Sequence, residues 1–132
     1  MKKFLFVLLM TAALVWSEAI PGQQEKTSDA FFNGVMAYRA FQFDEAARWF
    51  LNAAEHGDVE AQFLLGRMHY DGNSLRIDNV TAYMWFDIAA ANGLPAGRRY
   101  RNGLAKRMSE DEVAIARSRA EEWRRAHPGA SQ

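Results

Sequence analysis

Residues 46–57 read AARWFLNAAEHG, and residues 82–93 read AYMWFDIAAANG. The two stretches share the same alanine, tryptophan, phenylalanine and glycine positions, and every shared position recurs after 36 residues, as from Gly57 to Gly93. A fixed period of about 20 to 50 residues is typical of a solenoid built from repeated helix pairs. The shared pairs are Ala46 and Ala82, Trp49 and Trp85, Phe50 and Phe86, Ala53 and Ala89, Ala54 and Ala90, and Gly57 and Gly93.

A second set of matches precedes each of these stretches, at a shift of 32 residues. Because the two shifts differ by four residues, we expect an insertion between Tyr70 and Ala82, where residues 71–74 read DGNS and favour a turn. The matching positions are Phe31 and Phe63, Gly34 and Gly66, Met36 and Met68, and Tyr38 and Tyr70.

The apolar spacing predicts six helices in three antiparallel pairs, and no segment alternates with the period of a strand. Ser28 is expected to cap the first helix, Asp58 or Val59 opens the third, and Asp78 or Asn79 caps the fourth. Ser109 forms a capping box with Glu112 at the start of the last helix. Pro95 suits the first turn of the fifth helix. We therefore expect an all-α fold, an α/α superhelix or solenoid of three helix-turn-helix repeats.

The N-terminal residues 1–19 have the pattern of a secretory signal peptide. Two lysines precede an apolar run from Phe4 to Trp16, and Ser17-Glu18-Ala19 supplies small residues for cleavage after Ala19. An uncleaved membrane anchor is the alternative, but a bilayer span needs about 20 apolar residues. We expect an exported chain, periplasmic or secreted, whose only membrane contact is this segment before cleavage.

The charges balance over the whole chain, but they are unevenly distributed. Residues 20–93 hold five basic and ten acidic side chains, whereas residues 94–132 hold nine basic and five acidic ones. With no net positive charge, nucleic acid is not an expected partner. The absence of cysteine excludes disulfides, thiolate catalysis and cysteine metal sites.

The repeated residues resemble the Sel-one-like repeats, which are relatives of the tetratricopeptide repeats. Leu65, Gly66, Met68 and Gly72 match the first half of that motif, and the second half follows at Asp78, Ala82, Trp85, Ala89, Ala90 and Gly93. His69 departs from it, since the family usually has an aromatic residue there. The resemblance implies a right-handed superhelix that binds other proteins or peptides, often in export, envelope and stress pathways.

Residues 20–27 are mostly polar, contain Pro21 and Gly22 and have no apolar period, which is typical of a flexible segment. We expect a flexible leader at 20–27, a repeat domain at 28–127 and a flexible tail at 128–132. Within the domain, 28–57 and 58–93 are complete repeats and 94–127 is a degenerate capping repeat. In that last unit Arg124 stands where the second repeat has Phe86, and a polar residue suits a helix with no later repeat to pack on.

The first helix of each pair lines the concave surface in this class of protein, so partner-binding residues are expected there. The candidates form an aromatic groove that becomes basic towards the C-terminus, and aromatic and arginine side chains are common anchors in protein recognition. In the alternative, Phe31 and Phe63 simply cover the core. The candidates are Phe31, Val35, Tyr38, Arg39, Phe63, Arg67, Tyr70, Asp71, Arg99, Lys106 and Arg107.

The sequence does not favour catalysis, because it contains neither G-x-S-x-G nor H-E-x-x-H and its three histidines are far apart. We expect no catalytic residue, no cofactor and no metal. The leading hypothesis is an exported scaffold that binds a protein or peptide. The alternative is an envelope hydrolase, or a protein that binds peptidoglycan or another anionic polymer through its basic C-terminal half.

Overall fold

The structure is a computed structural model that describes residues 21–72 and 75–131. Within these ranges the chain forms six α-helices and one 3₁₀ helix and no strand, which confirms the expected all-α class. The predicted signal peptide lies outside the described residues. The helices are α1 (Pro21–Arg39), α2 (Phe43–Glu55), α3 (Val59–Asp71), α4 (Asn79–Ala91), α5 (Pro95–Ala105), α6 (Glu110–Ala126) and η1 (Pro128–Ala130).

Three helices begin at the caps that the sequence predicts. Asp58 accepts a hydrogen bond from the Ala61 amide at 2.9 Å, and Asp78 accepts one from the Thr81 amide at 3.0 Å. Ser109 starts α6 with a complete capping box. Because each cap satisfies an amide that the helix leaves unpaired, these side chains fix where the turns between helices end.

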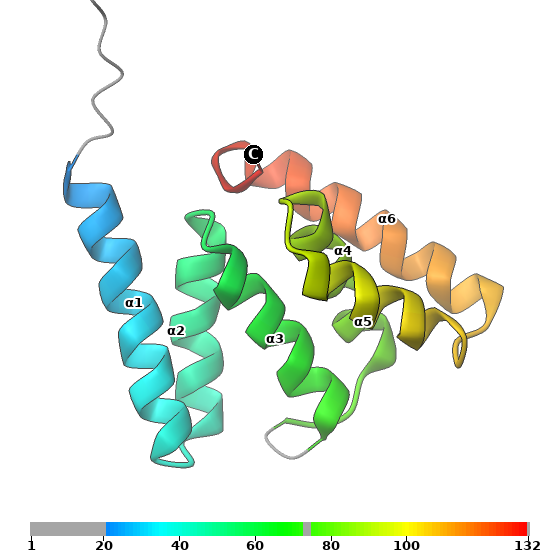
Figure 1. Ribbon diagram of the computed structural model, residues 1–132, viewed down its shortest axis with the longest axis horizontal. Coiled ribbons are helices and arrows are strands. Elements are labelled where there is room, and N and C mark those ends of the chain that lie inside the picture. The colour runs from blue at the N-terminus through cyan, green and yellow to red at the C-terminus, as the bar shows by residue number, and fades with distance from the viewer. Residues whose placement is uncertain (1–20, 73–74, 132) are drawn as a thin grey trace, which may run out of the picture.

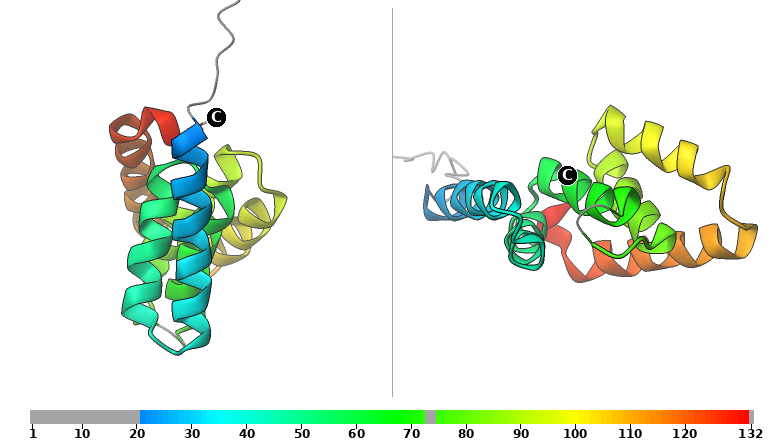
Figure 2. Two further views of the ribbon diagram at one scale, coloured as in Figure 1. Left: turned by 90° about the vertical axis from the view of Figure 1, so that its left-hand side faces the viewer. Right: turned by 90° about the horizontal axis from the view of Figure 1, so that it is seen from below.

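The helices form a short solenoid (Figure 1). Each helix from α2 to α5 packs on the helix before it, and α4 also packs on α6. The two further views place α1, α3 and α5 on one side of the molecule and α2 and α6 on the other (Figure 2). The first helices of the predicted pairs therefore share one face.

The same close contact joins the two helices within each of the first two pairs, α1 with α2 and α3 with α4. A Cβ atom built on Gly34 would lie 2.6 Å from the ring of Phe50, and one on Gly66 would lie 2.6 Å from the ring of Phe86. Both phenylalanines are buried. The glycines therefore let each first helix approach its partner until only a ring separates the backbones, as the repeat predicts.

The last two helices differ from the expected antiparallel pair. Both α5 and α6 pack mainly on α4 rather than on each other, and they diverge from the loop that joins them (Figure 2). On α6, the buried Ala116 and Ala120 are small enough to allow a close approach to α4, and the rings of Trp85 and Trp123 meet at 5.2 Å. This packing favours α4 over α5 as the support of α6.

The first helix begins at Pro21, earlier than the expected start at Ser28. Residues 21–27, expected as a flexible leader, are therefore helical. Proline fits the first turn of a helix, and the Gln, Glu and Lys residues of 23–26 have high helix propensity. These residues have no apolar period, so the period does not predict the helix that their propensity favours.

The C-terminal end also differs from the flexible tail expected at 128–132. Ala130 is buried, and its carbonyl accepts hydrogen bonds from Asn92 Nδ2 at 2.8 Å and from Gln62 Nε2 at 3.4 Å. A Cβ on Gly57 would lie 3.4 Å from the Gly129 carbonyl oxygen. Residues 128–130 are thus held against the turns that follow α2 and α4.

Candidate functional groove

A cavity of about 300 Å³ lies between α1 and α3, on the face formed by the first helices. Its walls are mainly apolar, with one ion pair at the edge. Four of its six lining residues are among the predicted partner-binding residues. The lining residues are Val35 and Tyr38 from α1, Phe50 from α2, and Leu64, Arg67 and Asp71 from α3.

Arg67 and Asp71 supply the polar edge of this cavity. Arg67 donates from Nε at 3.1 Å and from a terminal nitrogen at 2.9 Å, both to Asp71 Oδ2. Partial burial of Arg67 disfavours its charge, but the hydrogen bond and negative charge of Asp71 outweigh that effect, so the pKa of the guanidinium rises above its ordinary value. The guanidinium of Arg67 therefore keeps its charge beside an apolar pocket.

An aromatic cluster continues from the cavity towards α5. The Tyr100 ring lies 5.3 Å from the Phe63 ring and 5.6 Å from the Tyr70 ring. Arg67 lies 5.4 Å from the centre of the Tyr100 ring, and Arg107 lies 5.1 Å from that of Tyr70. These cation–π contacts hold two positive charges over the rings, where an anionic group could reach them.

The remaining candidates divide into core and surface residues. Phe31 is half-buried, and its ring lies 5.9 Å from that of Phe50, so it covers the core as the alternative interpretation states. Phe63 packs in the same manner on Phe86 at 5.6 Å. The side chains of Arg39, Arg99 and Lys106 are exposed and line neither the cavity nor the aromatic cluster.

Leu64 and Phe50 line the cavity and Tyr100 lies in the aromatic cluster, but none of the three is among the residues predicted to bind a partner. Tyr100 could have been found, because it lies three residues after Gly97 and four before Leu104, which are both buried and mark the inner face of α5. For Leu64 no comparable signal exists. Its exposure depends on how far α3 lies from α1, which the spacing of residues does not specify.

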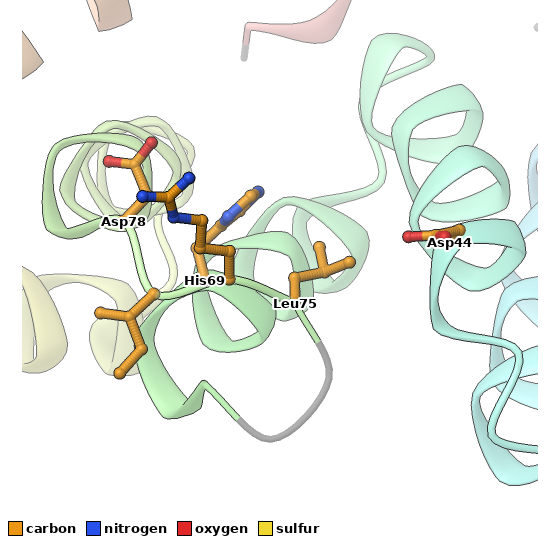
Figure 3. Close-up of a pocket in the computed structure, with 6 residues that line it drawn as sticks. Asp44, His69, Leu75 and Asp78 are labelled. Carbon is orange, nitrogen blue, oxygen red and sulfur yellow. The ribbon is translucent and has the colours of Figure 1, made fainter.

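A second cavity of about 560 Å³ lies beside the C-terminal end of α3, next to the turn that precedes α4. His69 and Asp78 lie close together there, whereas Asp44 stands apart on α2 (Figure 3). The buried Nδ1 atom of His69 has no hydrogen-bond partner in the described part of the chain. Leu75, Arg76 and Ile77 complete the lining.

The described residues contain neither a metal-binding cluster nor a helix able to span a membrane. Within 21–72 and 75–131, His, Asp and Glu side chains form no group of three that could hold a metal ion. In the same ranges, every helix is too short or too polar to cross a membrane.

Comparisons with known proteins bear on the predicted resemblance. The family model of the Sel1 repeat matches residues 26–58 and 59–94. Among solved structures, the chain is similar to a protective antigen of uropathogenic Escherichia coli strains that displays an SLR fold, with a TM-score of 0.71 and 26% sequence identity. That match covers 83% of this chain and 25% of the antigen, so the chain spans about a quarter of the length of its relative. Among curated proteins, none matches this sequence.

The two family matches together span more than half of the chain, and the solved relative has the same fold. These observations confirm the resemblance that the repeated residues predict. Domains of this kind are typically non-catalytic and generally bind protein partners. The chain therefore belongs to the Sel1 repeat family, whose α-solenoid fold is generally a scaffold for protein–protein interaction.

Proposed function

We propose that this chain is an exported scaffold that binds a protein or peptide segment in the groove between α1 and α3. The cavity of about 300 Å³ beside Tyr38 carries the proposal, because it combines an apolar floor with an ion pair at its edge. Binding sites usually pair an apolar pocket with a few polar groups that orient the ligand. An apolar side chain of the partner fits the pocket, and Arg67 and Asp71 orient the backbone or polar groups beside it.

Export is proposed from the sequence of residues 1–19, whose basic start and apolar run are typical of a signal peptide. The test is to express the full chain in a bacterial host, separate periplasm from cytoplasm, and measure the mass of the recovered protein. A periplasmic chain that begins at Ile20 supports export with cleavage after Ala19. A full-length chain confined to the cytoplasm contradicts it.

The groove is tested by placing a photo-crosslinking amino acid at Tyr38 in the native compartment and identifying the crosslinked partner. The matched control places the same amino acid at Ile115, an exposed apolar residue on α6. We expect a specific partner from position 38 alone, and its binding should weaken in the Tyr38→Ala and Tyr70→Ala double variant. Equal crosslinking from both positions, or equal binding by the double variant, contradicts the groove.

A second candidate function rests on the basic character of α5. Residues 94–108 contain five basic side chains and no acidic one, and Arg98, Arg99, Lys106 and Arg107 are exposed. Such a surface attracts anionic polymers through charge. Sedimentation with purified peptidoglycan that weakens as salt is added supports this function, and salt-independent sedimentation contradicts it. The Arg98→Ala and Arg99→Ala double variant tests the assignment to α5.

A further inference from the structure

The outward side of the α1–α2 pair, at the N-terminal end of the solenoid, carries exposed apolar side chains next to charged ones, and we call it the N-terminal face. It consists of Phe32 and Met36 on α1 and Glu45, Arg48 and Trp49 on α2. Two cavities of about 320 and 360 Å³ lie on it, and Trp49 lines both. The first view in Figure 2 shows α1 and α2 side by side at this end, with no other described helix in front of them.

Equivalent residues of the two repeats differ in how exposed their side chains are. Met36 is 48% exposed, whereas Met68, its counterpart in the next repeat, is 2% exposed. Trp49 is 36% exposed, whereas its counterpart Trp85 is 5% exposed and meets Trp123 at 5.2 Å. The same two residue types are therefore buried in the second repeat, where they belong to the core shared with the first repeat, and open in the first repeat. The N-terminal face has the composition of a repeat–repeat interface but lacks its partner within the described chain.

The charges on this face narrow the choice of partner. Glu45 and Arg48 flank Trp49 and line the same cavity, so one negative and one positive group stand beside the apolar centre. In the ranges 21–72 and 75–131, neither side chain takes part in an ion pair. In a twofold interface every contact occurs twice, with the two residues exchanged between the copies. A surface with adjacent opposite charges complements itself when a second copy is turned about such an axis.

We propose that the N-terminal face binds the N-terminal face of a second copy of this chain. Trp49 and Met36 of each copy fill the centre, and Glu45 of each copy pairs with Arg48 of the other. Two helices from each copy then form a four-helix arrangement, which is a stable way to bury an apolar stripe. The groove between α1 and α3 is lined by Val35 and Tyr38, and neither residue lines the cavities at Met36 and Trp49, so the dimer uses a different surface from the groove.

The test is sedimentation equilibrium of the purified protein over a range of concentrations, with its N-terminus established by mass spectrometry. We expect a reversible dimer. Trp49→Ala should raise the dissociation constant at least tenfold, because tryptophan is a frequent hot spot of interfaces. Ile115→Ala, which removes an exposed apolar side chain from α6, is the matched control and should leave the dissociation constant unchanged.

The charge arrangement is tested by reversal. Glu45→Arg and Arg48→Glu should each weaken the dimer, the double variant should restore it, and the two single variants should associate with each other when mixed. A monomer at all concentrations overturns the proposal. So does a dimer that Trp49→Ala leaves unchanged, or one that the double reversal fails to restore. Circular dichroism of each variant separates loss of association from loss of folding.

Discussion

Gly66 and Phe86 are so close that a Cβ atom on Gly66 would lie 2.6 Å from two carbons of the Phe86 ring. Phe86 is fully buried, and the rings of Phe63, Tyr70 and Tyr100 pack around it. We expect Gly66→Ala to lower the free energy of unfolding by about 1 to 3 kcal/mol, as is usual when a packed core is overfilled. Thermal unfolding followed by circular dichroism measures the change.

Gly103→Ala is the matched control for this substitution. It lies within α5, and a Cβ atom there would meet nothing within 4 Å. Alanine should therefore stabilise the helix by about 0.5 to 1 kcal/mol, so the two variants should shift the melting temperature in opposite directions. A melting temperature that Gly66→Ala does not lower contradicts the packing described for Gly66 and Phe86.

Asn92 is expected to hold the C-terminal segment through its amide nitrogen, which donates to Ala130 at 2.8 Å and to Gln62 Oε1 at 2.9 Å. Asn92→Asp keeps the shape of the side chain but replaces that donor with an acceptor. We expect a loss of about 1 to 3 kcal/mol, because partly buried acceptors then face each other. Chemical unfolding measures it. Asn102→Asp, on the exposed side of α5, is the control and should change stability by less.

Asp87 joins the last three helices, since it lies 2.8 Å from Arg101 on α5 and 3.5 Å from Arg124 on α6. Asp87→Ala removes the partner of two half-buried guanidinium groups. We expect it to cost about 1.5 to 3 kcal/mol, the usual value of hydrogen bonds to charged groups. Glu121→Ala, which breaks the exposed pair with Arg125, should cost no more than about 1 kcal/mol. Equal losses in urea unfolding contradict this role of Asp87.

The lowered pKa of Asp78 predicts that the stability of the fold depends on pH. Burial tends to raise the pKa of its carboxyl group, but hydrogen bonds from the amide and hydroxyl of Thr81 outweigh burial and lower the pKa below the ordinary value of 3.8. A group whose pKa is lowered by folding stabilises the folded state above the unfolded pKa. That contribution is lost as the pH falls through the lower pKa of the folded state. Asp78→Asn keeps a capping acceptor but does not titrate.

Melting temperatures of both proteins between about pH 2 and pH 7 provide the measurement. We expect the melting temperature of the wild type to be higher than that of the Asp78→Asn variant at neutral pH. The difference between the two melting temperatures should shrink as the solution becomes acidic. A difference that stays constant over this range, or grows at low pH, contradicts the assignment.

The sequence predicts those parts of the fold that depend on local chemistry. Asp58, Asp78 and Ser109 mark helix starts because a capping side chain acts within three residues of itself, and the repeated Gly66 and Phe86 mark the contact within a pair. The groove is only partly predictable. Tyr38 and Arg67 follow from helix spacing, whereas Leu64 enters the cavity because of the distance between α1 and α3.

Contacts between distant segments are the part that the sequence does not reveal. Ala130 and Gln62 are 68 residues apart, and neither has a pattern that points to the other. Trp49 and Trp85 have the same sequence context, but only Trp85 has a neighbour that covers it. Burial at repeated positions therefore depends on place in the solenoid rather than on residue type.

The hydrogen bonds from Gln62 and Asn92 to Ala130 change how the protein is expected to unfold. An open solenoid has contacts only between neighbours, so its repeats can melt one after another from either end. Here residues 128–130 connect the end of the chain to the turns after α2 and α4, which adds contacts of long sequence separation. The second repeat and the terminal helix should consequently unfold together in one cooperative step, and their folding should be slower than that of a repeat array with local contacts alone.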